Sequence, residues 1–183
     1  MKNIAVFCAS SPGQNGIYAS EAKKLGEILA DKGLGLVYGG ASRGLMNVVA
    51  DAVLQNGGKV TGIIPRMLDD LEITKNECTE IIYTSTMYER KVRMFEIADA
   101  VIILPGGFGT LDEMFEALTL SQLGLFEAPL GLLNTNGYYD LLAGFMDNMV
   151  REGFLKRENK DMLAICSSPE DLIEKIIKIN IYG

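Results

Sequence analysis

The sequence of 183 residues is 48% hydrophobic and carries a formal net charge of −7, which suits one domain over residues 1–183 with a single core. An acidic chain without a block of lysine or arginine lacks the clustered cations that nucleic acid binding rewards, so we expect no nucleic acid partner. The chain contains no histidine, which excludes every mechanism that uses imidazole as a base, a triad member or a metal ligand.

Short apolar runs alternate with segments of helical period along the whole chain. In chain order, the expected elements are strand Asn3–Cys8, helix Ile17–Lys32, strand Leu34–Tyr38, helix Gly44–Asn56, strands Val60–Ile64 and Glu80–Tyr83, helix Met87–Ala98, strand Ala100–Leu104, helix Leu111–Leu123, strand Leu130–Leu133, helix Tyr138–Glu152, strand Leu163–Cys166 and helix Pro169–Ile179. The strand runs are continuous rather than alternating, which is typical of a sheet covered on both faces. The pattern therefore predicts an α/β fold with a doubly wound parallel sheet, helices on both faces and right-handed crossovers.

The apolar runs are too short for a membrane partner or a secretion signal. No run approaches the roughly 18 residues of a membrane span, and the run Ile4–Phe7 is shorter than the ~7–15 residues of a signal peptide. The cysteines, Cys8, Cys78 and Cys166, are widely spaced and form neither a disulfide framework nor a zinc motif. We expect a soluble cytoplasmic protein.

The loops that follow the strands are the places to look for a ligand site. In open parallel sheets, ligands bind outside the carboxyl ends of the strands, near the point where the strand order reverses. The loops in question are Ala9–Gly16, Gly39–Arg43, Pro65–Leu71, Thr84–Thr86 and Pro105–Thr110.

The segment Pro105–Glu113 reads Pro-Gly-Gly-Phe-Gly-Thr-Leu-Asp-Glu between an expected strand and an expected helix. Its glycines allow close backbone approach to a ligand, and the free N–H groups at a helix start favour an anion, so the segment predicts a phosphate site. It matches neither the Walker loop nor the dinucleotide fingerprint. Thr110-x-x-Glu113 is also the pattern of a capping box, which needs no ligand at all.

A carboxylate at Glu113 would lie in the first turn of the expected helix. The helix dipole favours the charged form there, so we expect Glu113 to stay ionised near neutral pH. That state suits a base or a stabiliser of positive charge and suits a general acid poorly. Cleavage of an N-glycosidic bond passes through a cationic sugar that such a charge would stabilise.

Arg90 shares one stripe of its expected helix with Met94 and Ile97 and borders the core side. It could equally be a cation whose aliphatic stem packs on apolar neighbours. Lys91 and Arg93, taken alone, fit solvated surface charges. The glycines of Gly39–Gly44 fit a tight strand-to-helix turn as well as a second ligand loop.

At Met87-x-x-Arg90-Lys91 and Pro105-Gly-Gly-x-Gly-Thr-x-x-Glu113 the sequence resembles the Lonely Guy family of cytokinin riboside 5′-monophosphate phosphoribohydrolases. The resemblance covers essentially the whole chain and implies a Rossmann-like α/β domain that forms a homodimer. It implies hydrolysis of AMP or an N6-substituted AMP to the free base and ribose 5-phosphate, with Arg90 and Glu113 as the catalytic pair. It implies no cofactor and no metal.

The resemblance also implies a set of residues that contact the substrate. These are Glu72, Arg90, Lys91, Gly107, Phe108, Gly109, Thr110, Leu111, Asp112, Glu113 and Thr119. Backbone N–H groups of Gly107, Gly109 and Thr110 would hold the 5′-phosphate, and Met87 is expected to pack on the purine ring.

Two other functions are compatible with this type of sequence. A nucleotide or molybdenum-cofactor carrier would use similar glycine loops without hydrolysis, although phosphate binding alone requires neither Arg90 nor Glu113. Relatives have often been labelled lysine decarboxylases, but that chemistry needs pyridoxal phosphate bound to a lysine. We recognise no lysine in such a setting here.

Overall fold

A computed structural model describes residues 1–69 and 74–182. Its centre is one seven-stranded sheet in which every paired strand is parallel to its neighbour, in the order β4-β3-β2-β1-β5-β6-β7. The strands are β1 (Asn3–Phe7), β2 (Gly35–Tyr38), β3 (Val60–Pro65), β4 (Glu80–Thr84), β5 (Ala100–Ile103), β6 (Leu130–Leu133) and β7 (Leu163–Cys166). The predicted parallel α/β fold is confirmed.

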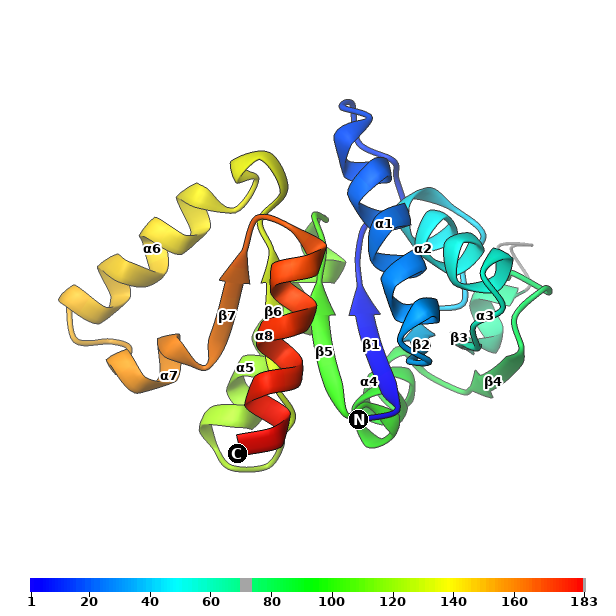
Figure 1. The fold of residues 1–183 in the computed structure, drawn as a ribbon. Helices are drawn as coiled ribbons and strands as arrows, with labels where there is room; N and C mark the ends of the chain where they lie inside the picture. The colour runs from blue at the N-terminus through cyan, green and yellow to red at the C-terminus, as the bar shows by residue number, and fades with distance from the viewer. Residues whose placement is uncertain (70–73, 183) are drawn as a thin grey trace.

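Helices cover both faces of this sheet (Figure 1). The long helices are α1 (Ile17–Asp31), α2 (Gly44–Gln55), α4 (Met87–Ile97), α5 (Phe108–Gln122), α6 (Asp140–Arg151) and α8 (Pro169–Tyr182). One hydrophobic cluster joins the sheet to α1, α2 and α8, and the other joins the opposite face to α4, α5 and α6. Because both faces are covered, β1 and β5 are buried along nearly their whole length.

The strand order reverses between β1 and β5. Strands β2, β3 and β4 are added on one side of β1, whereas β5, β6 and β7 are added on the other. In the register of this pair, Phe7 lies opposite Ile103, so the loops that follow both strands leave the sheet side by side. This is the switch point at which open parallel sheets bind ligands.

The structure adds short elements that the apolar pattern did not predict. They are α3 (Arg66–Asp69), the 3-10 turn η1 (Thr135–Gly137) and α7 (Arg157–Asp161). Helix α5 also begins at Phe108, three residues before the expected start at Leu111. Short polar helices bury too little apolar surface to show a periodic pattern, and glycines mask the start of α5.

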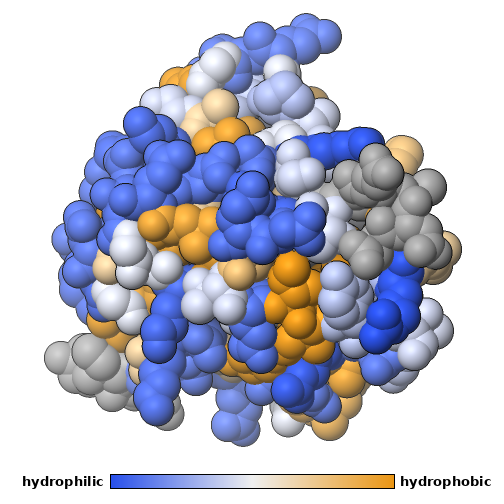
Figure 2. All heavy atoms as spheres, turned by 90° about the vertical axis from the view of Figure 1, so that its right-hand side faces the viewer, coloured by the Kyte–Doolittle hydropathy of each residue, from blue (hydrophilic) through white to orange (hydrophobic). Residues whose placement is uncertain are grey.

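Viewed from the β4 edge, the surface is mostly hydrophilic, with hydrophobic atoms in patches between the polar side chains (Figure 2). An edge strand exposes unpaired backbone groups, and polar cover limits its pairing with other chains. Among the described residues, no helix has both the length and the apolar character needed to cross a membrane.

Candidate active site

A cavity of about 440 Å³ opens at the carboxyl edge of the sheet, where β1 and β5 end. Its walls come from the end of β1, from the loops after β1, β2 and β5, and from helices α2, α3, α4 and α5. The residues that line it are Val6, Phe7, Cys8, Ala9, Ser10, Ser11, Gly39, Ala41, Met46, Leu68, Arg90, Gly107, Phe108, Gly109, Thr110 and Glu113. The structure thus brings together Arg90 and most of the glycine segment, which are remote in sequence.

Arg90 reaches the cavity from the first turn of α4. The helix is capped by Thr86, whose side chain accepts a hydrogen bond from the backbone N–H of Glu89. The Glu89 carboxylate in turn accepts one from the backbone N–H of Ser85, the residue before the N-cap, so side chains at both ends of Thr86–Glu89 hold the start of the helix. This cap fixes the turn from which the Arg90 side chain extends into the protein.

The Arg90 guanidinium is buried, with 8% of the residue exposed. Its Nε donates to the carbonyl oxygen of Ile63 at 3.2 Å, which orients the planar group. A Cβ on Gly39 would lie 2.1 Å from Nη2, so only a glycine leaves room for the guanidinium there. Arg90 is therefore held inside the site and is not merely a cation whose stem packs on apolar neighbours.

Glu113 faces Arg90 across the cavity floor, with Oε1 3.4 Å from Nη2. Both side chains are about nine-tenths buried. Burial raises the pKa of Glu113 to about 7; the Arg90 charge opposes this shift but does not cancel it, and the Asp112 charge adds to it. Glu113 therefore exists in both protonation states near neutral pH.

This result corrects the expectation that Glu113 stays ionised. That expectation rested on a place in the first turn of the helix, but α5 begins at Phe108, so Glu113 lies in the second turn. There the favourable effect of the dipole is weaker and desolvation dominates. A carboxyl group with a pKa near 7 can accept or donate a proton at physiological pH.

The capping-box interpretation of Thr110 and Glu113 is wrong. The N-cap residue of α5 is Gly107, and no side chain caps the helix. Thr110 is the third helical residue, and a Cβ on Gly106 would lie 2.1 Å from its Oγ1. Gly106 thus serves close packing against Thr110, and the uncapped start of α5 has the free first-turn N–H groups that an anion site requires.

Lys91 and Asp112 lie at the border of this site and neutralise each other. The Lys91 ammonium is 2.9 Å from Asp112 and 2.6 Å from Glu116. Burial alone would lower the pKa of Lys91, but the hydrogen bonds to the two carboxylates outweigh it and raise the pKa. These ion pairs join α4 to α5 beside the Arg90–Glu113 contact.

The other residues predicted to contact substrate are placed differently. Phe108 lines the cavity and is 94% exposed, whereas Leu111 packs against the core. Met87 is 43% exposed and does not line the cavity. Thr119 lies two turns further along α5, in a separate groove of about 160 Å³ between α5, α6 and α7. Glu72 lies outside the described residues.

The prediction from sequence missed several cavity residues. Cys8 ends the apolar run of β1, and Met46 belongs to the apolar stripe of α2, so both had the appearance of ordinary core residues. The Ile63 carbonyl is a backbone group, and no sequence signal reveals its bond to Arg90. The loops singled out from the sequence did point to part of the cavity wall, since Ala9–Gly16, Gly39–Arg43 and Pro65–Leu71 all supply lining residues.

The described residues do not fit a pyridoxal phosphate site. Among the ion-paired lysines of the described residues, the most deeply buried are Lys75, Lys160 and Lys91, and all three are held by carboxylates. Carboxylate partners keep an amine protonated, whereas a Schiff base requires the neutral amine. Among the residues that line the described cavity there is no lysine.

Residues 46–176 match a family model described as "Possible lysine decarboxylase". The chain is 43% identical over 175 residues to a cytokinin riboside 5′-monophosphate phosphoribohydrolase of Arabidopsis thaliana, covering 96% of this chain and 77% of the relative. It is 42% identical to a probable enzyme of the same name from Oryza sativa subsp. japonica, covering 96% of this chain and 72% of that one.

Solved structures with the same fold include proteins that carry a cofactor. A molybdenum cofactor binding protein of Rippkaea orientalis has a TM-score of 0.71 at 25% identity, over 97% of this chain and 96% of that one. The Moco carrier protein of Chlamydomonas reinhardtii has a TM-score of 0.74 at 16% identity, over 100% and 99% of the two chains, which shows a shared fold alone. The sequence matches are the ones that decide kinship, and by them this chain belongs to the Lonely Guy family of cytokinin riboside 5′-monophosphate phosphoribohydrolases.

Proposed function

We propose that this chain hydrolyses the N-glycosidic bond of a purine nucleoside 5′-monophosphate to the free base and ribose 5-phosphate. The observation that carries the proposal is the buried Arg90–Glu113 pair beside the glycine-rich start of α5, in one cavity at the strand switch point. The family relatives, which cover 96% of the chain, carry that activity in their names. AMP and N6-substituted AMP, such as a cytokinin riboside monophosphate, are the proposed substrates.

The start of α5 is the proposed place of the 5′-phosphate. Gly107 precedes the helix, and Gly109 and Thr110 form its first turn, where backbone N–H groups have no partner inside a helix. The positive end of the helix dipole lies at the same point. A phosphate there would place the attached ribose within the cavity that Glu113 and Arg90 line.

Glu113 is the proposed group that supports the reaction at the anomeric carbon. As the C1′–N9 bond breaks, its electron pair leaves with the base, and positive charge develops on the ribose. The ionised carboxylate stabilises that charge and accepts a proton from the attacking water, whose oxygen bonds to C1′. Overall, the hydroxyl of the water stays on C1′ of ribose 5-phosphate, and the proton that the water loses is balanced by the proton that the leaving base gains.

Arg90 has a supporting role in this proposal. Its Nε is occupied by the Ile63 carbonyl, which leaves the terminal nitrogens for Glu113 and for the nucleotide. The positive charge holds part of the Glu113 population ionised despite burial. Without that charge, desolvation would favour the protonated carboxyl even more strongly.

In the direct test, wild-type protein is incubated separately with AMP and with N6-isopentenyl-AMP, and the reaction products are separated by chromatography. We expect equimolar release of free base and ribose 5-phosphate from at least one of the two nucleotides. Stoichiometric nucleotide binding without release of base would instead favour a carrier function. The names of two solved structures with the same fold describe such a function. Comparing the two nucleotides also tells which base the cavity accepts.

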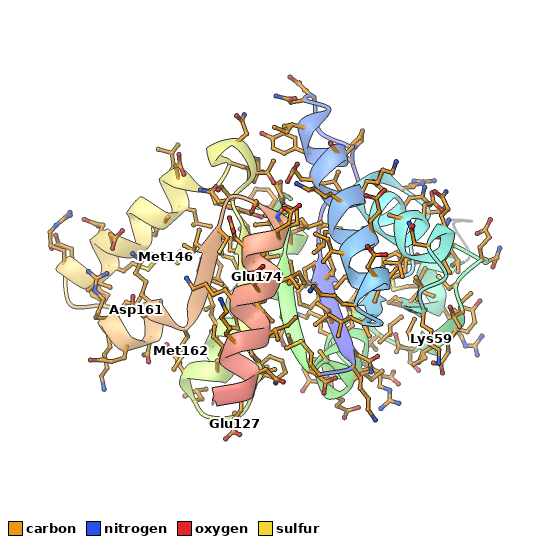
Figure 3. All side chains as sticks on the ribbon, in the orientation of Figure 1. Lys59, Glu127, Met146, Asp161, Met162 and Glu174 are labelled. Carbon is orange, nitrogen blue, oxygen red and sulfur yellow. The ribbon has the colours of Figure 1, made fainter. Side chains whose placement is uncertain are left out.

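We propose that the protein acts as a homodimer that associates through α6. Helix α6 lies at the β7 side of the molecule (Figure 1) and buries only Met146, which lies on its side toward β7 in Figure 3. Leu141 is 92% exposed and Phe145 is 54% exposed on the same helix. Large apolar residues exposed together on one helix favour a protein interface.

Sedimentation should therefore give a mass near twice the 19.9 kDa of one chain. Phe145→Glu would place a charge in the proposed interface and should shift the protein toward monomers at micromolar concentration. Ile179→Glu changes a residue of α8 that is 40% exposed and should leave the mass unchanged. A wild-type protein that sediments as a monomer would contradict the dimer.

We further propose that the protein is cytoplasmic and that its partner is a small molecule. Cys8, Cys78 and Cys166 are all free thiols, as is usual for proteins of a reducing compartment. The chain carries 24 acidic and 17 basic side chains, a balance that disfavours nucleic acid as a partner. These features support a cytoplasmic enzyme that acts on a small nucleotide.

A further inference from the structure

Two adjacent tyrosines hold the backbone of the glycine-rich loop from behind. The Tyr138 hydroxyl donates to the carbonyl oxygen of Gly106 at 2.8 Å, and the Tyr139 hydroxyl donates to that of Leu104 at 2.8 Å. Both hydroxyls therefore bond to the segment that connects β5 to the N-cap of α5. Neither tyrosine lines the cavity that contains Arg90 and Glu113.

The bond from Tyr138 fixes one particular peptide plane. In a planar trans peptide the C=O and the following N–H point in opposite directions, and the structure has no cis peptide among its described residues. Gly106 and Tyr138 both line a second cavity of about 230 Å³. Gly107 lines both cavities, so a carbonyl held on the Tyr138 side directs the Gly107 N–H toward the Arg90–Glu113 side.

Glycines make this plane mobile unless something fixes it. Gly106 and Gly107 adjoin it, and neither has a side chain to restrict rotation of the peptide between them. Gly107 is also the N-cap residue of α5, at φ −95° and ψ −150°, with no side chain that caps the helix. The hydrogen bond from the Tyr138 hydroxyl to the Gly106 carbonyl thus determines which way this peptide faces.

We propose that Tyr138 is a positioning residue that aims the Gly107 N–H at the 5′-phosphate of the substrate. The proposal rests on the proposed function, because it assigns the anion at the start of α5 to a nucleotide phosphate. Tyr138 touches no substrate atom in this scheme; it acts through the backbone of Gly106 and Gly107. Its loss removes a preorganised donor, so the free loop samples orientations that cannot bind the phosphate.

Tyr139 offers a matched control within the same turn. Its hydroxyl donates to the Leu104 carbonyl and also interacts with the Gly106 N–H, whereas the peptide that Tyr138 holds is the next one, between Gly106 and Gly107. The peptide that follows the Leu104 carbonyl leads to Pro105, which has no N–H to aim. Tyr139 is buried at 2% exposure, whereas Tyr138 is 45% exposed. Removing the Tyr139 hydroxyl leaves a buried carbonyl unpaired, which costs stability, whereas water can replace the Tyr138 hydroxyl.

The phenylalanine variants should keep the local packing. The Tyr138 ring meets Tyr18 at 5.8 Å and Tyr139 at 4.8 Å between ring centroids, both edge to face. The turn that carries the pair is held by Asn134, whose Oδ1 accepts from the backbone N–H of Tyr139 at 2.7 Å. None of these contacts involves the hydroxyl of Tyr138.

The test compares Tyr138→Phe and Tyr139→Phe by calorimetric binding of ribose 5-phosphate and by thermal unfolding. We expect Tyr138→Phe to weaken ribose 5-phosphate binding roughly five- to thirtyfold, the loss of one aligned bond to an anion. Adenine binding should stay within about twofold, and the melting temperature should barely change. Tyr139→Phe should lower the melting temperature by about 3–10 °C and leave ribose 5-phosphate binding within about twofold.

Equal weakening of ribose 5-phosphate binding by both variants would overturn the proposal, because the loop would then respond to general loosening. An unchanged affinity in Tyr138→Phe would overturn it as well. Because binding of the product is measured without turnover, the result does not depend on catalysis. If wild type binds ribose 5-phosphate but releases no base from either nucleotide, the proposed function fails while the role of Tyr138 is still decided by the two variants.

Discussion

Replacing Glu113 with glutamine should lower kcat for release of base from AMP by roughly 10²–10⁴-fold, the usual range for loss of a catalytic acid–base group. The amide keeps the size of the side chain but can neither take the proton of water nor oppose positive charge on the ribose. The KM for AMP should change little, because the phosphate is held at the start of α5. The effect is measured by quenching the reaction at set times and quantifying free adenine by chromatography.

The same variant should not be less stable than wild type at pH 8. Because burial raises the pKa of Glu113 from 4.5 to about 7, folding favours the protonated carboxyl. The stability that comes with the proton is present below pH 4.5 and is lost as the pH rises through 7. A neutral amide avoids that loss, which is at most about 3 kcal/mol for the shift from 4.5 to 7.

Glu127→Gln is the matched control for this experiment. Glu127 is exposed and lies at the opposite end of the sheet from the carboxyl edges of the strands (Figure 3). The same chemical change there should leave kcat within about twofold, since surface substitutions are usually neutral. If Glu113→Gln retained full activity in a folded protein, Glu113 would not be the group that supports the reaction.

The regular part of the fold could be predicted from sequence because strands buried on both faces of a sheet are continuous apolar runs. Strands such as Ala100–Ile103 are continuous apolar runs, this one between Asp99 and the turn that starts at Pro105, and their expected and observed bounds differ by at most one residue. The elements that escaped prediction are short and polar, such as Arg157–Asp161. Their positions are set by the surrounding parts of the folded chain, and their sequences have no hydrophobic periodicity that would predict a helix.

The site was predictable only in part, for a different reason. Motifs gave the identities of Arg90 and Glu113, but the charge state of Glu113 depends on how deeply α5 is buried and where it begins. The error came from a helix boundary that the glycines concealed. The hydrogen bonds from Tyr138 to Gly106 and from Arg90 to Ile63 join side chains to backbone carbonyls. Every residue has such a carbonyl, so the sequence does not indicate which one is bonded.

Arg90→Gln should lower kcat/KM at pH 7 by roughly 10²-fold or more, since it removes a buried charge that acts on both Glu113 and the nucleotide. The charge 3.4 Å from Oε1 opposes the effect of burial, so its loss should raise the pKa of Glu113 above 7. The active form in the proposed reaction is the ionised carboxylate. In wild type kcat/KM should therefore rise with pH and level off above about 7, and in the variant that rise should move to higher pH.

A pH profile of kcat/KM separates this electrostatic effect from simple loss of the fold. Arg90→Gln also leaves Glu113 without its cation, so the variant should lose more stability at pH 8.5, where the carboxylate is charged, than at pH 6. Arg90→Lys keeps the charge but lacks the planar fork that uses Nε for Ile63 and Nη2 for Glu113, so its profile should lie near that of wild type at reduced kcat. If the acid limb stays in place in Arg90→Gln, a group other than Glu113 controls it. If the limb moves as expected, the buried pair is one unit in which arginine sets the fraction of Glu113 able to react.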